Sequence, residues 1–356
     1  MPVLEEVNPH PKDSLLTFED EGHRYTYVPL ECAIRKSMTG LLKPRFETFD
    51  GEAIVHERFA GWLKDDSHKY GPLTQYLTLV KQMDRADAEK EILKLWSAKG
   101  DVAAAAGTQM HRDLELYWND QLPEPTPTTP PPMGCVSFLG LLEWWNPEME
   151  LKPWRTEFLC VLTATDDEGI EFPVVAGSID LIMQDKQGNF WLVCSDTHAL
   201  AHRLNLMIRP SNAQFDYKRT SPKTRGLLGK RKAEASKFFK VDMAKAPFQD
   251  HPADDFTKYS CQLAGYAWIL KHGNYNMNVV STTIVQMHED LNGKAHAIET
   301  ADVFEEVDAM MRLEIQIAKR ERRLAKAEKE GREPTVEELA PPAVEWRGGY
   351  LLDAEF

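Results

Sequence analysis

One carboxylate stands in the middle of an apolar strand pattern. The segment VVAGSIDLIM (174–183) and the run FWLV (190–193) flank the turn DKQGN, and together they predict a β-hairpin. Asp180 lies within the first strand. A lone carboxylate among apolar neighbours is costly to bury unless it is paired or bound to a metal ion. Asp180 is therefore a candidate for one of these two arrangements.

Strand and helix patterns alternate along the rest of the chain. Apolar strand patterns cover 23–30, about 154–193 and 278–289. Helical periodicity covers 36–50, 52–64, 73–99, 101–120, 136–146, 258–273 and 301–331. Gly100 is expected to end the helix before it, and the charged second half of the last helix is expected to project into solvent. This order predicts an α/β (α+β) fold with a mixed central β-sheet flanked by helices.

Three regions follow from these patterns. Residues 1–100 form an N-terminal decoration of strand and helices, 101–300 form the core, and 301–356 form a charged C-terminal helix and tail. The stretch PEPTPTTPPP (123–132) is a Pro-rich linker, because proline is excluded from helix interiors and central strands.

Composition excludes several classes of protein. No apolar run reaches the eighteen or more residues of a membrane span, and the N-terminus lacks a signal-peptide pattern, so an intracellular protein without a membrane partner is expected. The five cysteines are scattered, and no two have C-x-x-C spacing. This argues against a disulfide framework, a zinc knuckle and an iron–sulfur cluster.

The charge of the chain is unevenly distributed. Its net charge is −14, which by itself disfavours a phosphate-binding surface. Residues 216–245, however, contain ten Lys and Arg against three Asp and Glu, a local charge of +7. A nucleic-acid contact and an ordinary solvated loop both account for such a segment.

Four short motifs contain the residues that could bind a metal ion or take part in catalysis. GTQMHRDLE (107–115) places His111 and Glu115 on one helix face. RTEF (155–158) contains Glu157, GSID (177–180) contains Asp180, and QLAGY (262–266) contains Gln262 and Tyr266. Taken singly, a helical histidine, a cross-strand carboxylate and a Gln/Tyr pair on a helix all have ordinary structural explanations.

The order of these motifs resembles the RecB-like exonuclease branch of the PD-(D/E)XK nuclease superfamily. That branch has GT-x-x-H-x-x-x-E, then G-x-x-D, then D-x-K, then Q-x-x-x-Y. The resemblance spans about residues 20–290 and is specific in combination. It implies a restriction-endonuclease-like core and a nuclease activity.

The D-x-K element has two candidate positions. Directly after FWLV, Cys194 and Asp196 stand in place of the Asp and the Lys, which would mean an inactive enzyme. FDYKRT (215–220) instead supplies Asp216 and Lys218. Residues 194–214 are then an insertion in the catalytic strand, and their removal joins FWLV to FDYKRT.

The resemblance implies a role for each site residue. His111, Asp180, Asp216 and the carbonyl of Tyr217 would hold Mg²⁺ or Mn²⁺, while Lys218 would activate water and Glu157 would support the metal shell or hold Lys218. Gln262 and Tyr266 would position the DNA strand near the scissile phosphate. The phosphate backbone of the DNA would be contacted, without readout of its base sequence, by the basic residues Arg219, Lys223, Arg225, Lys230, Arg231 and Lys232.

The sequence therefore predicts a metal-dependent, exonuclease-like enzyme that hydrolyses phosphodiester bonds of single- or double-stranded DNA. A catalytically inactive relative that only binds nucleic acid is the alternative, because the catalytic strand is interrupted. An unrelated acidic scaffold is a third interpretation; it predicts neither divalent-ion binding nor salt-dependent DNA affinity.

Overall fold

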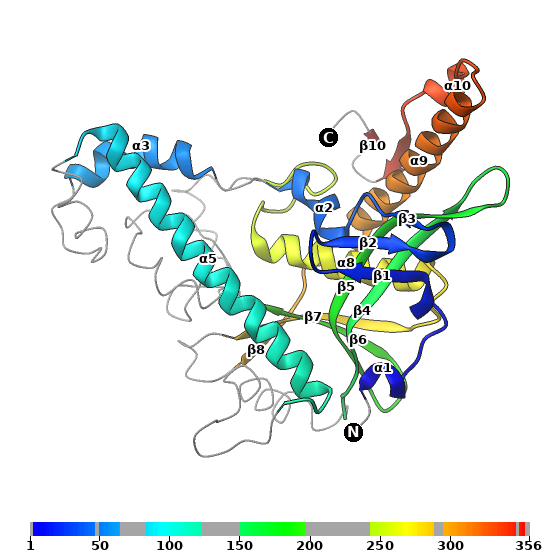
Figure 1. Ribbon diagram of the computed structural model, residues 1–356, viewed down its shortest axis with the longest axis horizontal. Coiled ribbons are helices and arrows are strands. Elements are labelled where there is room, and N and C mark those ends of the chain that lie inside the picture. Colours follow the sequence, from blue (N-terminus) through cyan, green and yellow to red (C-terminus); the bar gives the residue numbers. More distant parts are fainter. Residues whose placement is uncertain are drawn as a thin grey trace.

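A five-stranded mixed sheet forms the centre of the fold (Figure 1). The computed structural model describes residues 3–46, 50–64, 83–122, 150–196, 243–287, 295–346 and 349–352. The strands, in spatial order, are β4 (Lys152–Thr165), β5 (Glu171–Gln184), β6 (Phe190–Asp196), β7 (Val279–Met287) and β8 (Ala295–Glu299). β6 and β7 are parallel, and the other neighbours are antiparallel. The predicted mixed α/β class with a mixed central sheet is confirmed.

The hairpin of β5 and β6 follows from its turn chemistry. Asp185 Oδ1 accepts hydrogen bonds from the backbone N–H groups of Gln187 and Asn189, at 2.9 Å each. Gly188 has φ +85°, a left-handed conformation that glycine adopts without a Cβ penalty. The DKQGN turn therefore sets the register Leu181↔Val193 between the two strands.

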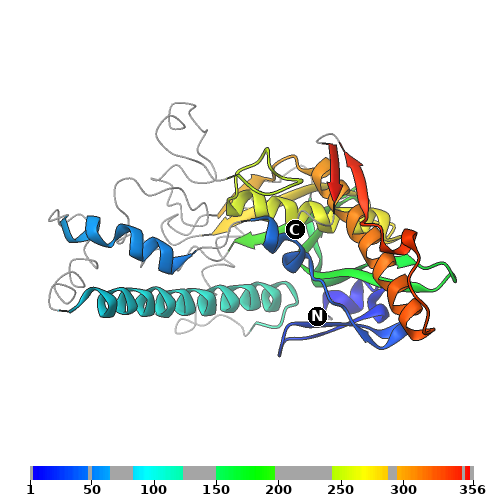
Figure 2. The ribbon, with the colours of Figure 1, turned by 90° about the horizontal axis from the view of Figure 1, so that it is seen from above.

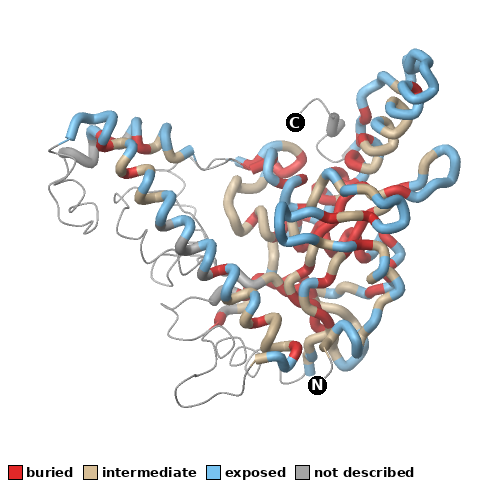
Figure 3. Tube along the Cα trace, viewed as in Figure 1, coloured by how far each residue is buried: buried red, intermediate tan, exposed pale blue. Residues whose placement is uncertain are grey.

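Two helices cover one face of the sheet. α8 (Asp255–His272) and α9 (Phe304–Lys329) bury most of the apolar core against β4, β5 and β6 (Figure 3). Asp254 caps α8 by accepting a hydrogen bond from the Thr257 N–H at 2.8 Å. The helix predicted over 258–273 is confirmed, and so is the strand predicted over 278–289, except for its last two residues, which lie outside the described ranges.

A single long helix, α5 (Arg85–Trp118), covers the opposite face with its C-terminal part (Figures 1 and 2). There Leu114 packs on Leu181, Met183 and Val193. The prediction that Gly100 ends a helix is wrong. Glycine costs about 1 kcal/mol in a helix interior, which an Ala-rich helix of 34 residues tolerates. The helix also crosses the predicted boundary between residues 100 and 101.

The N-terminal part of α5 runs out beyond the sheet together with α3 (Gly51–Lys64) (Figure 2). The residues of this arm are mostly exposed (Figure 3). Arg85 links the two helices, because its guanidinium donates to the carbonyl of His56 at 2.8 Å.

A small three-stranded sheet packs on β4 and β5. Its strands are β1 (Leu16–Glu19), β2 (Arg24–Tyr27) and β3 (Cys32–Ala33). Tyr25 and Tyr27 bury their rings against Val161 and Ala176. Before this sheet, α1 (Leu4–Val7) lies along β4, where the Asn8 side chain donates to the carbonyl of Trp154 at 2.9 Å.

The second half of α9 is only partly solvated. Arg322 and Arg323 pair with Asp166 and Asp167 in the β4–β5 turn, at 2.6 and 2.8 Å, and Lys326 pairs with Glu168. The prediction that this half projects into solvent therefore needs correction, because the acidic turn holds one side of it. The remaining elements are α2 (Met38–Leu42), α10 (Val336–Leu339), β9 (Ala343–Trp346) and β10 (Gly349–Leu352).

Several predicted segments fall wholly or partly outside the described ranges. These are the linker at 123–132, the helix at 136–146, the first part of the helix at 73–99, and the basic segment at 216–245 except for its last three residues. Among the described helices, none combines the length and apolarity that crossing a membrane requires. The four cysteines of the described ranges are free thiols: Cys32, Cys160, Cys194 and Cys261.

Candidate metal site

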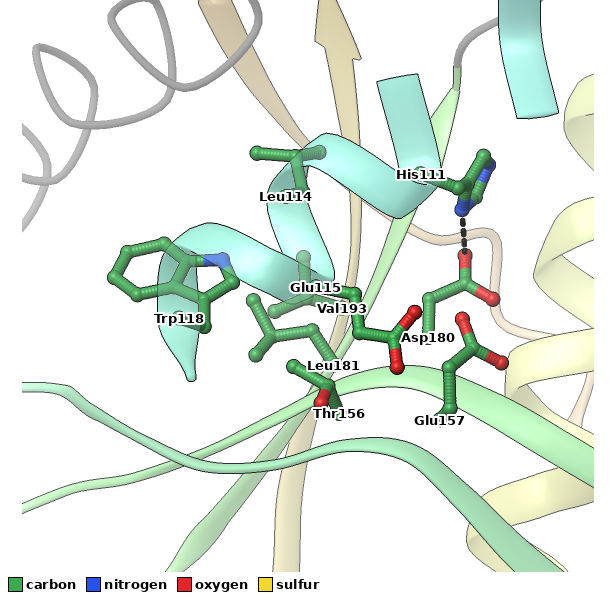
Figure 4. A pocket seen from close by; sticks show the side chains of 9 residues that line it. All are labelled: His111, Leu114, Glu115, Trp118, Thr156, Glu157, Asp180, Leu181 and Val193. Carbon is green, nitrogen blue, oxygen red and sulfur yellow. Dashed lines mark ion pairs between the residues drawn. The ribbon is translucent and has the colours of Figure 1, made fainter. Parts of the chain in front are cut away.

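Three of the predicted site residues converge in space. His111 of α5, Glu157 of β4 and Asp180 of β5 each offer one ligand atom, and these atoms all lie within 4.8 Å of one another. His111 Nδ1 lies 3.7 Å from Asp180 Oδ2, and the three side chains face one another (Figure 4). An imidazole and two carboxylates form a donor set that suits a divalent cation such as Mn²⁺.

A local distortion of β4 aims Glu157 at this site. Thr156 and Phe158 are two residues apart and would share one face of a regular strand. Phe158 is instead buried in the core beneath α8, whereas Thr156 lines a pocket beside α5. Glu157 between them has φ +45°, in the left-handed region that costs an L-residue roughly 1 to 2 kcal/mol. The strand therefore changes faces at the site.

The register places Asp180 directly opposite Glu157. Thr156 pairs with Leu181 and Phe158 pairs with Ile179 on either side of them. β5 changes faces at the same point, since Ile179 belongs to the core beneath α8 and Leu181 to the core beneath α5. Two carboxylates are thus held side by side at the bend of the hairpin.

This crowding changes the acidity of Glu157. The pKa of its carboxyl is raised from 4.5 to about 7, first because surrounding protein atoms desolvate the carboxylate, and second because of the charge of Asp180. The Ser178 hydroxyl donates to Glu157 Oε2 at 2.7 Å and opposes the rise in pKa. The outer side of Glu157 remains open to solvent, so a cation can approach it. A bound cation would relieve the repulsion between the two carboxylates.

A small pocket of about 20 Å³ lies at the convergence point (Figure 4). It has room for one water-sized particle. Its walls combine the three candidate ligands with Glu115, Thr156 and apolar side chains that include Leu114 and Trp118. Glu115 also raises the pKa of Glu157 through its charge. The sequence placed Glu115 on the helix face of His111, and its position in the pocket agrees with that.

The Q-x-x-x-Y pair lies beneath the site. Tyr266 is 4% exposed, and its hydroxyl accepts a hydrogen bond from the Gln262 amide at 3.2 Å. A Cβ at Gly177 would lie 2.5 Å from Cε1 of the Tyr266 ring, so the GSID motif needs glycine at its first position. The described contacts give Tyr266 a packing role, and a direct contact of Gln262 or Tyr266 with DNA stays a prediction.

The N-terminal sheet contributes two residues that the sequence analysis did not identify. Burial, together with the charges of Glu157 and Asp180, raises the pKa of the Tyr25 phenol, which lies next to the Ser178 backbone. Asp20, in the β1–β2 turn, adds to the field that raises the pKa of Glu157. In the sequence, Tyr25 is one aromatic residue of a short strand, and Asp20 is one acid of a turn. Neither has a motif that marks it.

The predicted D-x-K residues lie outside the described ranges. Asp216, Tyr217 and Lys218 belong to this group, as do the six basic residues expected to track DNA: Arg219, Lys223, Arg225, Lys230, Arg231 and Lys232. Their roles stay predictions.

The structure does describe the strand where the D-x-K element is expected. β6 continues through Cys194, Ser195 and Asp196, which pair with β7. The first three residues of the predicted insertion 194–214 are therefore strand, and the rest lie outside the described ranges. One step beyond the pair Leu181↔Val193, the register brings position 194 opposite Asp180. In the chain as it stands, Cys194 occupies that position.

Comparisons with protein-family models, with curated proteins and with solved structures return no match.

Proposed function

We propose that this chain is a metal-dependent nuclease of the PD-(D/E)XK type, with its hairpin and α5 forming a restriction-endonuclease-like core. The supporting observation is the convergence of His111, Glu157 and Asp180 from three elements that are distant in the sequence. A chance match to a single motif would not bring side chains from three separate elements together in space. The motifs that resemble the family thus coincide with the one His/Asp/Glu group of this kind among the described residues.

The donor set fits the metal that the family resemblance implies. Carboxylate oxygens suit Mg²⁺ and Mn²⁺, and the imidazole of His111 shifts the preference toward Mn²⁺. When bound, such an ion would neutralise phosphoryl charge and lower the pKa of a bound water. Asp180 and His111 would hold the ion, and Glu157, with its pKa near 7, would complete the shell or accept a proton.

A specific observation favours a second function, a non-catalytic protein that binds nucleic acid. β6 runs as strand through residue 196, and the positions that the family motif requires to be Asp and Lys are Cys194 and Asp196. A site in this form has fewer carboxylate ligands and lacks the expected cation. It would bind a metal more weakly and would not cleave.

The register suggests a sharp experiment. Deleting residues 193–214 joins FWL to FDYKRT, which puts Asp216 at position 194, opposite Asp180 in the strand register, and Lys218 at position 196. Deleting residues 194–214 puts Asp216 one position later, and a one-residue shift turns every side chain to the other face. The assay is Mn²⁺-dependent cleavage of end-labelled single- and double-stranded DNA, with the folding of each chain checked by thermal unfolding.

We expect cleavage by the chain lacking 193–214 and none by the chain lacking 194–214. Asp180→Asn in the active chain should abolish cleavage. Cleavage by the full chain as well would mean that its own FDYK segment reaches the site, whereas a silent full chain would establish the non-catalytic form. If the chain lacking 193–214 folds but neither cleaves DNA nor binds Mn²⁺, the nuclease proposal is wrong.

A further inference from the structure

A second pocket, of about 240 Å³, adjoins the metal site on its β4 side. It shares Glu115, Thr156 and Glu157 with the small pocket at the metal site. Its outer wall is the N-terminal segment, through residues such as Val3 and Glu5. A group bound at the metal site would therefore have this pocket directly beside it.

Asn119 holds the walls of this pocket together. Its side chain, on a residue that is only 8% exposed, accepts a hydrogen bond from the Leu4 N–H at 2.8 Å and donates to Thr156 Oγ1 at 2.9 Å. It also donates to the carbonyl of Glu115 at 2.8 Å. One amide thus connects the N-terminal segment, the end of α5 and β4, so the pocket is a built feature.

Arg155 provides the second connection. Its Nη1 donates to the carbonyl of Asn8 at 3.1 Å and to Asp13 Oδ2 at 2.9 Å, and its Nη2 lies 3.3 Å from Glu5 Oε1. Arg155 is 5% exposed; its two terminal nitrogens are engaged by these oxygen atoms, and its Nε is buried out of reach of a ligand. It is therefore not available as a clamp for an incoming phosphate.

The remaining chemistry of the pocket is acidic. Its charged lining consists of four carboxylates, Glu5, Asp13, Glu115 and Glu157, against the single cation Arg155. Ionised carboxylates only accept hydrogen bonds, so they suit ligands with hydroxyl or amino donors. A terminal phosphate brings further negative charge and acceptor oxygens, and the pocket disfavours it.

The volume limits the ligand to a small group. Pockets for drug-sized ligands measure about 300 to 1,000 Å³, so a pocket of 240 Å³ accepts no more than a unit such as one nucleoside. We infer that the pocket receives the nucleoside at the free end of a nucleic-acid strand, and that it selects a terminal hydroxyl over a terminal phosphate. This inference rests on the proposed function, in which the neighbouring phosphate lies at the metal site.

The test uses internally labelled single-stranded oligonucleotides with the full chain. The 5′ and 3′ ends carry a hydroxyl or a phosphate in all four combinations, and a circular form of the same sequence has no end. Cleavage is measured with Mn²⁺, and binding is measured with Ca²⁺ in place of Mn²⁺, so that the end preference is determined whether or not the chain cleaves. We expect hydroxyl-ended strands to be preferred at one of the two ends, and the circle to be neither cut nor bound tightly.

Glu5→Gln removes one carboxylate from the outer wall of the pocket. The preference for hydroxyl over phosphate should fall by roughly two- to fivefold, as expected for the loss of one partly exposed charge. Glu6→Gln is the matched control, because Glu6 lies next to Glu5 in the same exposed helix and does not line the pocket. It should leave the preference unchanged.

The outcomes separate the inference from the proposed function. Cleavage or binding that treats circles like linear strands, or phosphate ends like hydroxyl ends, overturns the inference and leaves the nuclease proposal standing. An equal effect of Glu5→Gln and Glu6→Gln also overturns it. Neither cleavage nor binding of any oligonucleotide would overturn both.

Discussion

At the scale of single residues, the site depends on one backbone outlier. Glu157 adopts φ +45° at the point where β4 changes faces, and the register places it directly opposite Asp180. The sequence marks both residues as acids among apolar neighbours. It does not mark the bend that brings them together, because the left-handed conformation is maintained by packing on both sides of the strand.

The raised pKa of Glu157 gives a first prediction. A metal ligand must be deprotonated to bind, so protonation of Glu157 competes with the metal at low pH. We expect Mn²⁺ affinity to rise steeply as the pH increases toward about 7 and to level off above it, because the pKa of Glu157 is about 7. Titration calorimetry from pH 6 to 8 measures this.

Glu157→Gln is the control for that pH dependence. It removes the carboxyl, so it should weaken Mn²⁺ binding at pH 8 and flatten the pH dependence between 6 and 8. The raised pKa of Glu157 also affects the folding stability of the metal-free protein. An acid with a raised pKa loses stability as the pH rises from about 4.5 through about 7, so Glu157→Gln should raise the melting temperature more at pH 8 than at pH 5. A wild-type pH profile in Glu157→Gln would assign the effect to another group.

Gly177 gives a second prediction at this scale. In Gly177→Ala the new Cβ would lie 2.5 Å from the Tyr266 ring, which is buried and cannot move away freely. We expect destabilisation of about 1 to 3 kcal/mol, as for other overpacked cores, measured by denaturant unfolding. Because the strand carrying Asp180 must shift, Mn²⁺ affinity should also fall. Unchanged stability would mean that Tyr266 does not pack on GSID.

At the scale of elements, amphipathic pattern predicted most of the helices and strands near the site. The helix over 258–273 and the strand over 278–289 lie where periodicity placed them, because both have a continuous buried face. The long helix α5 differs, since Gly100 was expected to divide it. A single glycine is a weak stop signal. Here it is outweighed by the packing of the C-terminal half of α5 on the sheet and by the contact of its N-terminal half with α3.

Gly100→Ala tests this account of α5. A Cβ at position 100 would meet nothing within 4 Å, and the residue lies inside a continuous helix. The substitution should therefore stabilise the protein by up to about 1 kcal/mol. Thermal unfolding measures it beside Gly177→Ala, and the two glycine substitutions should have opposite signs. A destabilising Gly100→Ala would indicate that the helix does end at this residue.

At the scale of the whole molecule, the candidate site connects elements that are far apart in the sequence. α5 covers one face of the sheet, α8 and α9 cover the other, and the small N-terminal sheet closes the side near β4 and β5 (Figures 1 and 2). An ion held by His111, Glu157 and Asp180 would link α5 to the hairpin. Its binding free energy would therefore add to the stability of the whole fold.

We expect Mn²⁺ to raise the melting temperature. At a free concentration 100 times the dissociation constant, the gain is about 2.7 kcal/mol, which corresponds to several degrees for a protein of this size. His111→Ala should lose most of this gain, whereas His56→Ala, an exposed histidine of the α3 arm, should keep it. Loss of the gain in both variants would point to nonspecific binding.

The sequence by itself determined the mixed α/β class, the β5–β6 hairpin and the candidacy of Asp180 as a paired or metal-bound carboxylate, whereas His111 and Glu157 became candidates only through the resemblance to a nuclease family. These depend on local periodicity, on turn chemistry and on the cost of placing a carboxylate in an apolar strand. Only the tertiary structure decided that Glu157 faces Asp180, that Tyr266 is buried against Gly177 and that β6 continues through Cys194 to Asp196. Each of these three features depends on strand register and on packing between residues that are distant in the chain. Register and long-range packing are not encoded in any short stretch of sequence.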